Sequence, residues 1–121
     1  MKKFIKLNLY ISLLIAPVVL MANNDDVRHY PYVHIENTTD FYIKGTVGYA
    51  SAFCSDDNFY ITPNSSWTAD SRGVCLVTKI TATNQNTGET GTSYESSGTA
   101  YSQFLVYKDT NGKPSVTRKV N

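Results

Sequence analysis

Residues 74–82, Val-Cys-Leu-Val-Thr-Lys-Ile-Thr-Ala, form the most apolar segment of the chain outside its first 22 residues. Along a strand, alternate residues point to opposite faces. The two faces predicted here are Val74, Leu76, Ile80 and Ala82 on one side and Cys75, Val77, Lys79 and Thr81 on the other. Apolar side chains on both faces are typical of a strand inside a sheet. We therefore expect residues 74–82 to form a central strand.

The segments upstream of this strand also favour strands over helices. Tyrosine, threonine, valine and isoleucine are frequent, and no stretch repeats its apolar residues at helical spacing. Residues 30–36 predict a strand with Val33 and Ile35 on its core face. Residues 41–50 predict a second strand, in which Gly45 and Gly48 indicate a bulge or close packing. The apolar residues of that second strand share one face at every second position: Phe41, Ile43, Val47 and Tyr49.

The rest of the chain predicts further short strands separated by turns, at 59–62, 66–69, 99–108 and 115–120. Residues 84–98 contain no aliphatic side chain larger than threonine, so we expect a hairpin or a mobile loop there. Asn111-Gly112 predicts a hairpin turn of type I′. Seven or eight short strands of this kind indicate an all-β fold, either a small antiparallel β-sandwich or a barrel.

The first 22 residues have the pattern of an export signal. Lys2, Lys3 and Lys6 precede an apolar run from residue 7 to 21, which ends at Ala22. The alternative is an uncleaved membrane anchor, but about 15 mostly apolar residues fall short of the ~20 that span a bilayer. We expect a cleaved signal peptide at 1–22, a flexible segment at 23–29 and a single domain at 30–121. The lysine-rich start indicates a bacterial protein, secreted or periplasmic.

Export would deliver the two cysteines, Cys54 and Cys75, to an oxidising compartment. A pair of thiols in a small exported domain usually forms a bridge, so we expect one disulfide. Two N-glycosylation acceptor patterns begin at Asn37 and Asn64. In a bacterial protein these are ordinary turn sequences.

Charge and motifs exclude several classes of function. Loss of the three signal lysines changes the formal charge from +1 to −2, and the remaining basic residues are scattered, so nucleic acid is not an expected partner. The chain contains no serine elbow, glycine-rich phosphate loop or zinc-type cysteine spacing. His29 and His34 fall on opposite faces of a strand and cannot jointly bind a metal there. We therefore predict no enzyme activity, no metal and no cofactor.

Exposed aromatic residues are the remaining candidate for function. If Val33 and Ile35 face the core, Tyr32 faces out, and by the same argument Tyr42 faces out beside Lys44. Tyrosine combines a flat apolar ring with a hydroxyl and suits the recognition of protein, sugar or lipid headgroups. The predicted binding surface consists of Tyr30, Tyr32, Tyr42, Lys44 and Trp67.

These residues predict an exported, non-enzymatic binding module for a protein or glycan ligand, with no permanent membrane span and no assigned oligomeric state. Two alternatives stay open. The first is a small toxin or virulence factor that acts at a membrane surface through aromatic loops. The second is a small hydrolase whose carboxylates, Asp56, Asp57 and Asp70, are brought together by folding.

Overall fold

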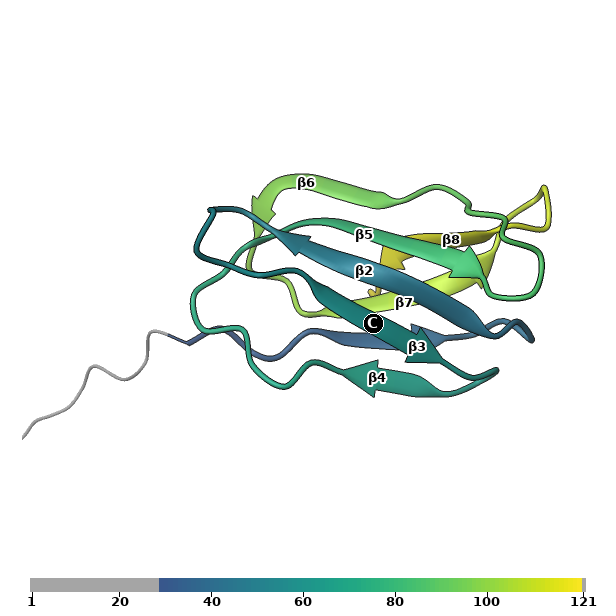
Figure 1. Cartoon of the computed structure of the whole chain (residues 1–121), viewed down its shortest axis with the longest axis horizontal. Coiled ribbons are helices and arrows are strands. Elements are labelled where there is room, and N and C mark those ends of the chain that lie inside the picture. The colour runs from purple at the N-terminus through teal and green to yellow at the C-terminus, as the bar shows by residue number, and fades with distance from the viewer. Residues whose placement is uncertain (1–28, 121) are drawn as a thin grey trace, which may run out of the picture.

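The computed structural model describes residues 29–120 and forms two four-stranded sheets stacked face to face (Figure 1). The first sheet has the order β4-β1-β7-β8, with β1 at His34–Asn37, β4 at Ser66–Thr68, β7 at Gln103–Lys108 and β8 at Pro114–Arg118. The second has the order β3-β2-β5-β6, with β2 at Ile43–Tyr49, β3 at Asp57–Ile61, β5 at Val77–Asn84 and β6 at Tyr94–Thr99. The predicted all-β sandwich is confirmed. The signal peptide predicted at 1–22 lies outside the described residues, as does most of the 23–29 segment.

Neighbouring strands pair in antiparallel fashion with one exception, because β1 runs parallel to β7. Both strands enter the first sheet from the same end of the sandwich. Between β1 and β7 the chain passes through β2 and β3 of the second sheet, β4 of the first sheet, and β5 and β6 of the second sheet. The parallel pair makes the first sheet mixed, and the long connection between β1 and β7 is the kind of crossover that a parallel pair requires.

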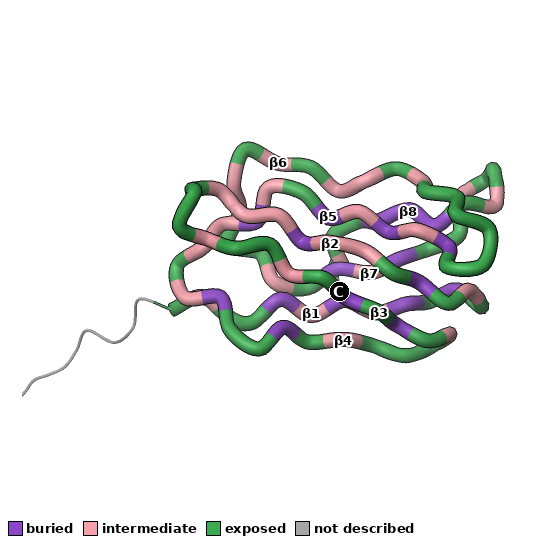
Figure 2. Tube along the Cα trace, in the orientation of Figure 1, coloured by how far each residue is buried: buried purple, intermediate pink, exposed green. Residues whose placement is uncertain are grey.

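The core lies between the two sheets and follows the predicted alternation. Seven fully buried residues meet there. The first sheet and the segment leading into it contribute Val33, Ile35, Phe104 and Val106, and the second sheet contributes Ile43, Val47 and Ile80. Figure 2 shows this alternation as buried positions recurring along the interior strands. Two aromatic pairs join the sheets: Phe59 lies 5.4 Å from Trp67, and Tyr94 lies 4.9 Å from Phe104, measured between ring centroids. The predicted core faces of the first two strands are confirmed.

Strand β5 is central as predicted, between β2 and β6, but its two faces differ from the expected ones. The strand begins at Val77, and Val74 is 57% exposed. Val77 and Ile80 are both fully buried although strict alternation places them on opposite faces. The cause is a register shift of β5 against β6 between Val77 and Lys79. This irregularity interrupts the alternation, so the Val77 side chain points to the same side of the sheet as that of Ile80.

Both glycines of β2 have the structural roles predicted for them. The register of β2 against β5 shifts between Gly48 and Tyr49, which is the expected bulge. A Cβ atom at Gly45 would overlap the carbonyl oxygen of Thr81 and the ring of Phe59. Gly45 therefore allows β2 to approach both neighbouring strands.

The two later turns show one confirmation and one correction. Residues 84–98 contain a hairpin turn followed by β6, and Gly91 and Thr92 form backbone hydrogen bonds with β8. The turn before β8 is not of type I′, because Gly112 is its only residue with positive φ, at 76°. The carboxylate of Asp109 accepts the backbone N–H groups of Asn111 and Lys113, which stabilises a turn with a single left-handed residue at its end.

Candidate functional site

The five residues of the predicted binding surface do not form one surface. Tyr32 lies on the segment that leads into β1 and is exposed, whereas Lys44 lies in β2 of the other sheet and Tyr42 directly precedes that strand. Tyr30 is half-buried, with its ring centroid 5.3 Å from the guanidinium carbon of Arg72. Trp67 is half-buried against Phe59 between the sheets. Tyr30 and Trp67 thus support the fold, and only Tyr42 and Lys44 stand together in solvent.

Tyr42 and Lys44 belong to a larger polar surface on the outer face of the second sheet, which we call the tyrosine face. It comprises Tyr42, Lys44, Thr46, Asn58, Tyr60, Thr81 and Thr83. Lys44 and Thr46 alternate with the buried Ile43 and Val47, so their side chains point away from the core. The strand register sets Lys44 opposite Tyr60 on β3 and Thr83 on β5.

The aromatic part of the tyrosine face is a pair of neighbouring rings. The centroids of Tyr42 and Tyr60 lie 6.3 Å apart with a 35° angle between the ring planes. Their exposed fractions are 43% and 52%, so both rings offer apolar surface to solvent. Tyr60 was not among the predicted site residues. Its signal was present in the sequence, since it alternates with the apolar Phe59 and Ile61 in the predicted strand.

A shallow depression of about 300 Å³ adjoins this pair. Lys44, Thr46, Asn58, Thr81 and Thr83 line it together with Gly45 and Phe59. Its volume lies at the lower end of the roughly 300–1,000 Å³ typical of small-molecule sites. The hydroxyl of Thr46 donates to Asn58 Oδ1 over 3.3 Å, and the hydroxyls of Thr83 and Thr90 lie 2.6 Å apart. The lining is therefore rich in hydroxyl and amide groups.

Lys44 is the only charged residue among the seven of the tyrosine face; further along the same outer face, Lys79 on β5 and Glu95 on β6 form an ion pair. Among residues 29–120, the ion pairs are Lys79 with Glu95, at 3.9 Å, and Lys119 with Glu36, at 2.6 Å. Lys44 takes part in neither, and none of the seven residues of the face is acidic. An exposed ammonium group thus stands beside two tyrosine rings.

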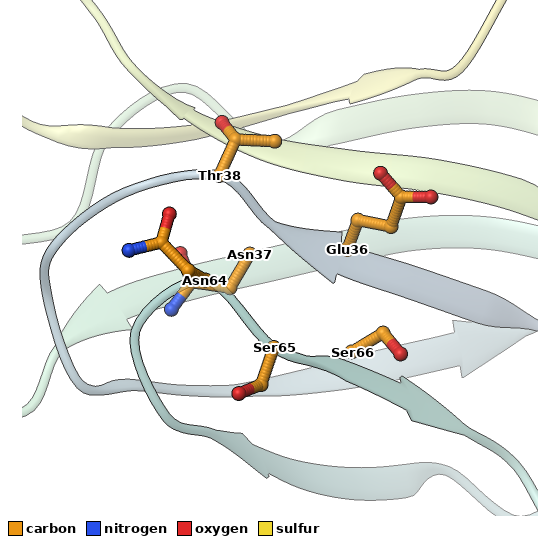
Figure 3. Close-up of a pocket in the computed structure, with 6 residues that line it drawn as sticks. All are labelled: Glu36, Asn37, Thr38, Asn64, Ser65 and Ser66. Atoms are coloured by element: carbon orange, nitrogen blue, oxygen red, sulfur yellow. The ribbon is translucent and has the colours of Figure 1, made fainter.

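A second hollow, of about 360 Å³, lies where β1 ends beside the turn between β3 and β4 (Figure 3). Its lining side chains come from these two segments: Glu36, Asn37 and Thr38 from the first, and Asn64, Ser65 and Ser66 from the second. We call it the polar cleft.

Most groups of the polar cleft already serve the fold. The amide of buried Asn37 donates to the carbonyls of Phe41, Ile61 and Thr62, while its oxygen accepts from Thr39. Asn37 is therefore inaccessible as a glycosylation acceptor in the folded protein, whereas Asn64 is exposed. Lys119 donates to Glu36 and holds the pKa of that carboxyl below its usual value. This hollow is thus largely a structural joint between strands.

The opposite end of the sandwich is held by the disulfide and by Arg72. Cys54 and Cys75 are bonded, as predicted, with an S–S distance of 2.03 Å. The Arg72 side chain is 4% exposed, and its guanidinium donates to the carbonyls of Cys75, Pro31, Ala100 and Thr99. Burial lowers the pKa of Arg72. One buried cation thus ties together the disulfide loop, the segment before β1 and the connection between β6 and β7.

Carboxylates and histidines are distributed over several elements. Asp57 lies in β3 and accepts a 2.6 Å hydrogen bond from the hydroxyl of Tyr49; burial and this carboxylate raise the pKa of Tyr49. His34 Nδ1 lies 2.8 Å from Thr68 Oγ1 on the first sheet. Within the described part of the chain, no three His, Cys, Asp or Glu residues are grouped to hold a metal ion. The same residues contain no helix that is long and apolar enough to span a membrane.

Comparison with known proteins provides a fold relationship. No family model matches the chain, and neither does any curated protein. Among solved structures, the chain is similar to the NMR structure of a protein from Eubacterium rectale, with a TM-score of 0.59 and 17% sequence identity. The match covers 82% of this chain and 97% of the other. At this identity the similarity shows a shared all-β fold.

Proposed function

We propose that the protein is an exported, non-enzymatic binding module that recognises a protein or glycan ligand through the tyrosine face. The observation that carries this proposal is the pairing of two half-exposed tyrosine rings on the outer face of the sandwich, beside a lysine that forms no ion pair with any of residues 29–120. Sheet strands hold these side chains at fixed spacing, so little conformational entropy is lost when a ligand binds.

The disulfide supports the exported location that this proposal includes. A disulfide is consistent with an oxidising compartment, in which a secreted or periplasmic protein folds. The bridge also closes a loop between residues 21 apart in sequence, and this stabilises a small scaffold.

The experiment is ligand capture by the oxidised protein. Wild type, a Tyr42→Ala/Tyr60→Ala variant and a Tyr32→Ala/Tyr107→Ala control are applied to glycan arrays and to crosslinked envelope and host-cell extracts. Tyr32 and Tyr107 are also exposed tyrosines, but they lie on the segment before β1 and on β7, so the control removes the same number of rings elsewhere. We expect capture to be lost only when Tyr42 and Tyr60 are replaced. Equal capture by both double variants would show that the tyrosine face is not the binding surface.

One observation favours a second function, which is action at a membrane surface. Phe53 is 96% exposed on a loop whose next residue, Cys54, is bonded to Cys75, and Val74 before that second cysteine is also exposed. A phenyl ring held out on a fixed loop suits insertion into a lipid interface. Release of dye from liposomes by wild type, abolished by Phe53→Ser, would support this function. Dye retention with wild type would oppose it.

A further inference from the structure

The tyrosine face has the composition of a site for a hydroxyl-rich ligand. Its members apart from the tyrosines and Lys44 are threonines and one asparagine, and no aliphatic side chain lies among them. Hydroxyl and amide groups both donate and accept hydrogen bonds, which matches the hydroxyl groups of a sugar. A protein interface of standard size instead needs a dry core of apolar and aromatic side chains.

The charge of the tyrosine face indicates the charge of the ligand. Lys44 is the single cation among the seven residues of the face, no carboxylate of residues 29–120 pairs with it, and none of the seven is acidic. An ammonium group in this setting attracts a carboxylate and discriminates against a cationic ligand. The lysine is therefore complementary to an acidic sugar.

The strand register places these chemical features next to one another. Lys44 stands directly opposite Tyr60, and side chains at such positions have Cβ atoms about 4.5–5.5 Å apart. The same lysine borders the 300 Å³ depression lined by Asn58, Thr81 and Thr83. A sugar ring lying on Tyr60 would thus have its neighbouring unit over the depression and a carboxylate within reach of Lys44.

We infer that the tyrosine face binds an anionic oligosaccharide, with a sugar ring stacked on Tyr60 and a sugar carboxylate paired with the Lys44 ammonium. This inference rests on the proposed binding function and names its ligand class. The ring contributes apolar contact, the threonine and asparagine groups contribute hydrogen bonds, and Lys44 contributes selectivity for acid over neutral sugars.

The test uses three acidic probes: a galacturonic acid tetrasaccharide, a hyaluronan tetrasaccharide and sialyllactose. Each is compared with its carboxyl-reduced counterpart, which keeps the linkages and removes the charge. Affinities are measured by NMR titration for wild type, Lys44→Gln, Tyr60→Ala and a Lys113→Gln control, in which another exposed lysine in the turn before β8 loses its charge.

We expect at least one acidic probe to bind more tightly than its reduced counterpart. Lys44→Gln should weaken that binding about two- to fivefold, the range of an exposed ion pair, and leave the reduced probe unaffected. Tyr60→Ala should weaken both forms about fivefold, because it removes the stacked ring. Lys113→Gln should match wild type.

Two results would overturn the inference in different ways. Equal binding of acidic and reduced probes, unchanged by Lys44→Gln, would remove the preference for acid while leaving a glycan-binding face. Absence of binding by all three acidic probes would overturn the ligand class itself. Capture through Tyr42 and Tyr60 in the array and extract experiment would then decide separately whether the tyrosine face binds another ligand.

Discussion

Replacement of Arg72 by methionine tests how the end of the sandwich with the disulfide is held together. Methionine retains an unbranched apolar stem but removes the donors to four carbonyl groups, at 2.8 Å for Cys75, 3.0 Å for Pro31, 3.2 Å for Ala100 and 2.7 Å for Thr99. At a net contribution of about 0.5–1.5 kcal/mol each, four hydrogen bonds contribute about 2–6 kcal/mol.

Two effects reduce the expected loss for this variant. The guanidinium no longer has to be desolvated, and the adjoining hollow of about 240 Å³ lets water approach some of the freed carbonyls. We therefore expect Arg72→Met to lower the free energy of unfolding by about 3 kcal/mol. Arg72→Lys should lose nearly as much of the free energy of unfolding, because one ammonium group cannot replace the planar guanidinium that reaches four carbonyls.

The assay is urea denaturation followed by the fluorescence of Trp67, which packs between the sheets. Arg118→Met is the matched control, because Arg118 is exposed and stacks 3.4 Å from the ring centroid of Tyr101. Removal of this stacked guanidinium should lower the free energy of unfolding by less than about 1 kcal/mol. An Arg72→Met variant within about 0.5 kcal/mol of wild type would refute the role assigned to the buried guanidinium, since that is the range of ordinary surface substitutions.

Three further predictions concern stability. Gly45→Ala should lower the free energy of unfolding by at least about 2 kcal/mol, because the new Cβ would overlap the Thr81 backbone and the Phe59 ring. Gly48→Ala, whose Cβ has room, should lower it less in the same urea assay. Cys54→Ala/Cys75→Ala should lower the free energy of unfolding by about 3 kcal/mol, and an unchanged denaturation midpoint would contradict this. Hydrogen bonds from Lys113, Ser115 and Asn111 lower the pKa of Asp109, and Lys119 lowers that of Glu36. Both carboxylates therefore stabilise the fold at neutral pH and lose this effect as the pH falls below about 4, so thermal scans from pH 7 to pH 2 should show a steeper loss for wild type than for Asp109→Asn.

Much of the fold follows from local sequence patterns. Period-two alternation identified β1 and β2 and their buried faces, with Val33, Ile35, Ile43 and Val47 in the core as expected. Gly45 and Gly48 were informative because a glycine within a strand often marks a bulge or a close approach of two backbones. The paired cysteines followed from their number and from the predicted export of the chain.

The features that sequence patterns did not reveal depend on distant residues. The parallel pairing of β1 with β7 joins segments about 70 residues apart, and no local pattern specifies a strand's partner. Arg72 resembles any scattered surface cation until four carbonyls from three segments converge on it. The candidate site shows the same limit: alternation placed Tyr42 and Lys44 outward, but their proximity to Tyr60 required the register of β2 against β3.

Chemical-shift mapping on the uniformly ¹⁵N-labelled, oxidised protein tests the central claim most directly. A ligand obtained from the arrays or extracts is titrated into the protein, and the amide shifts are followed along the chain. The binding role of the tyrosine face predicts the largest changes at residues 42–46, 58–60 and 81–83, with Tyr42→Ala/Tyr60→Ala removing them. Largest changes at the disulfide end, in residues 50–57 and 71–76, would contradict the account and assign binding to the Phe53 loop.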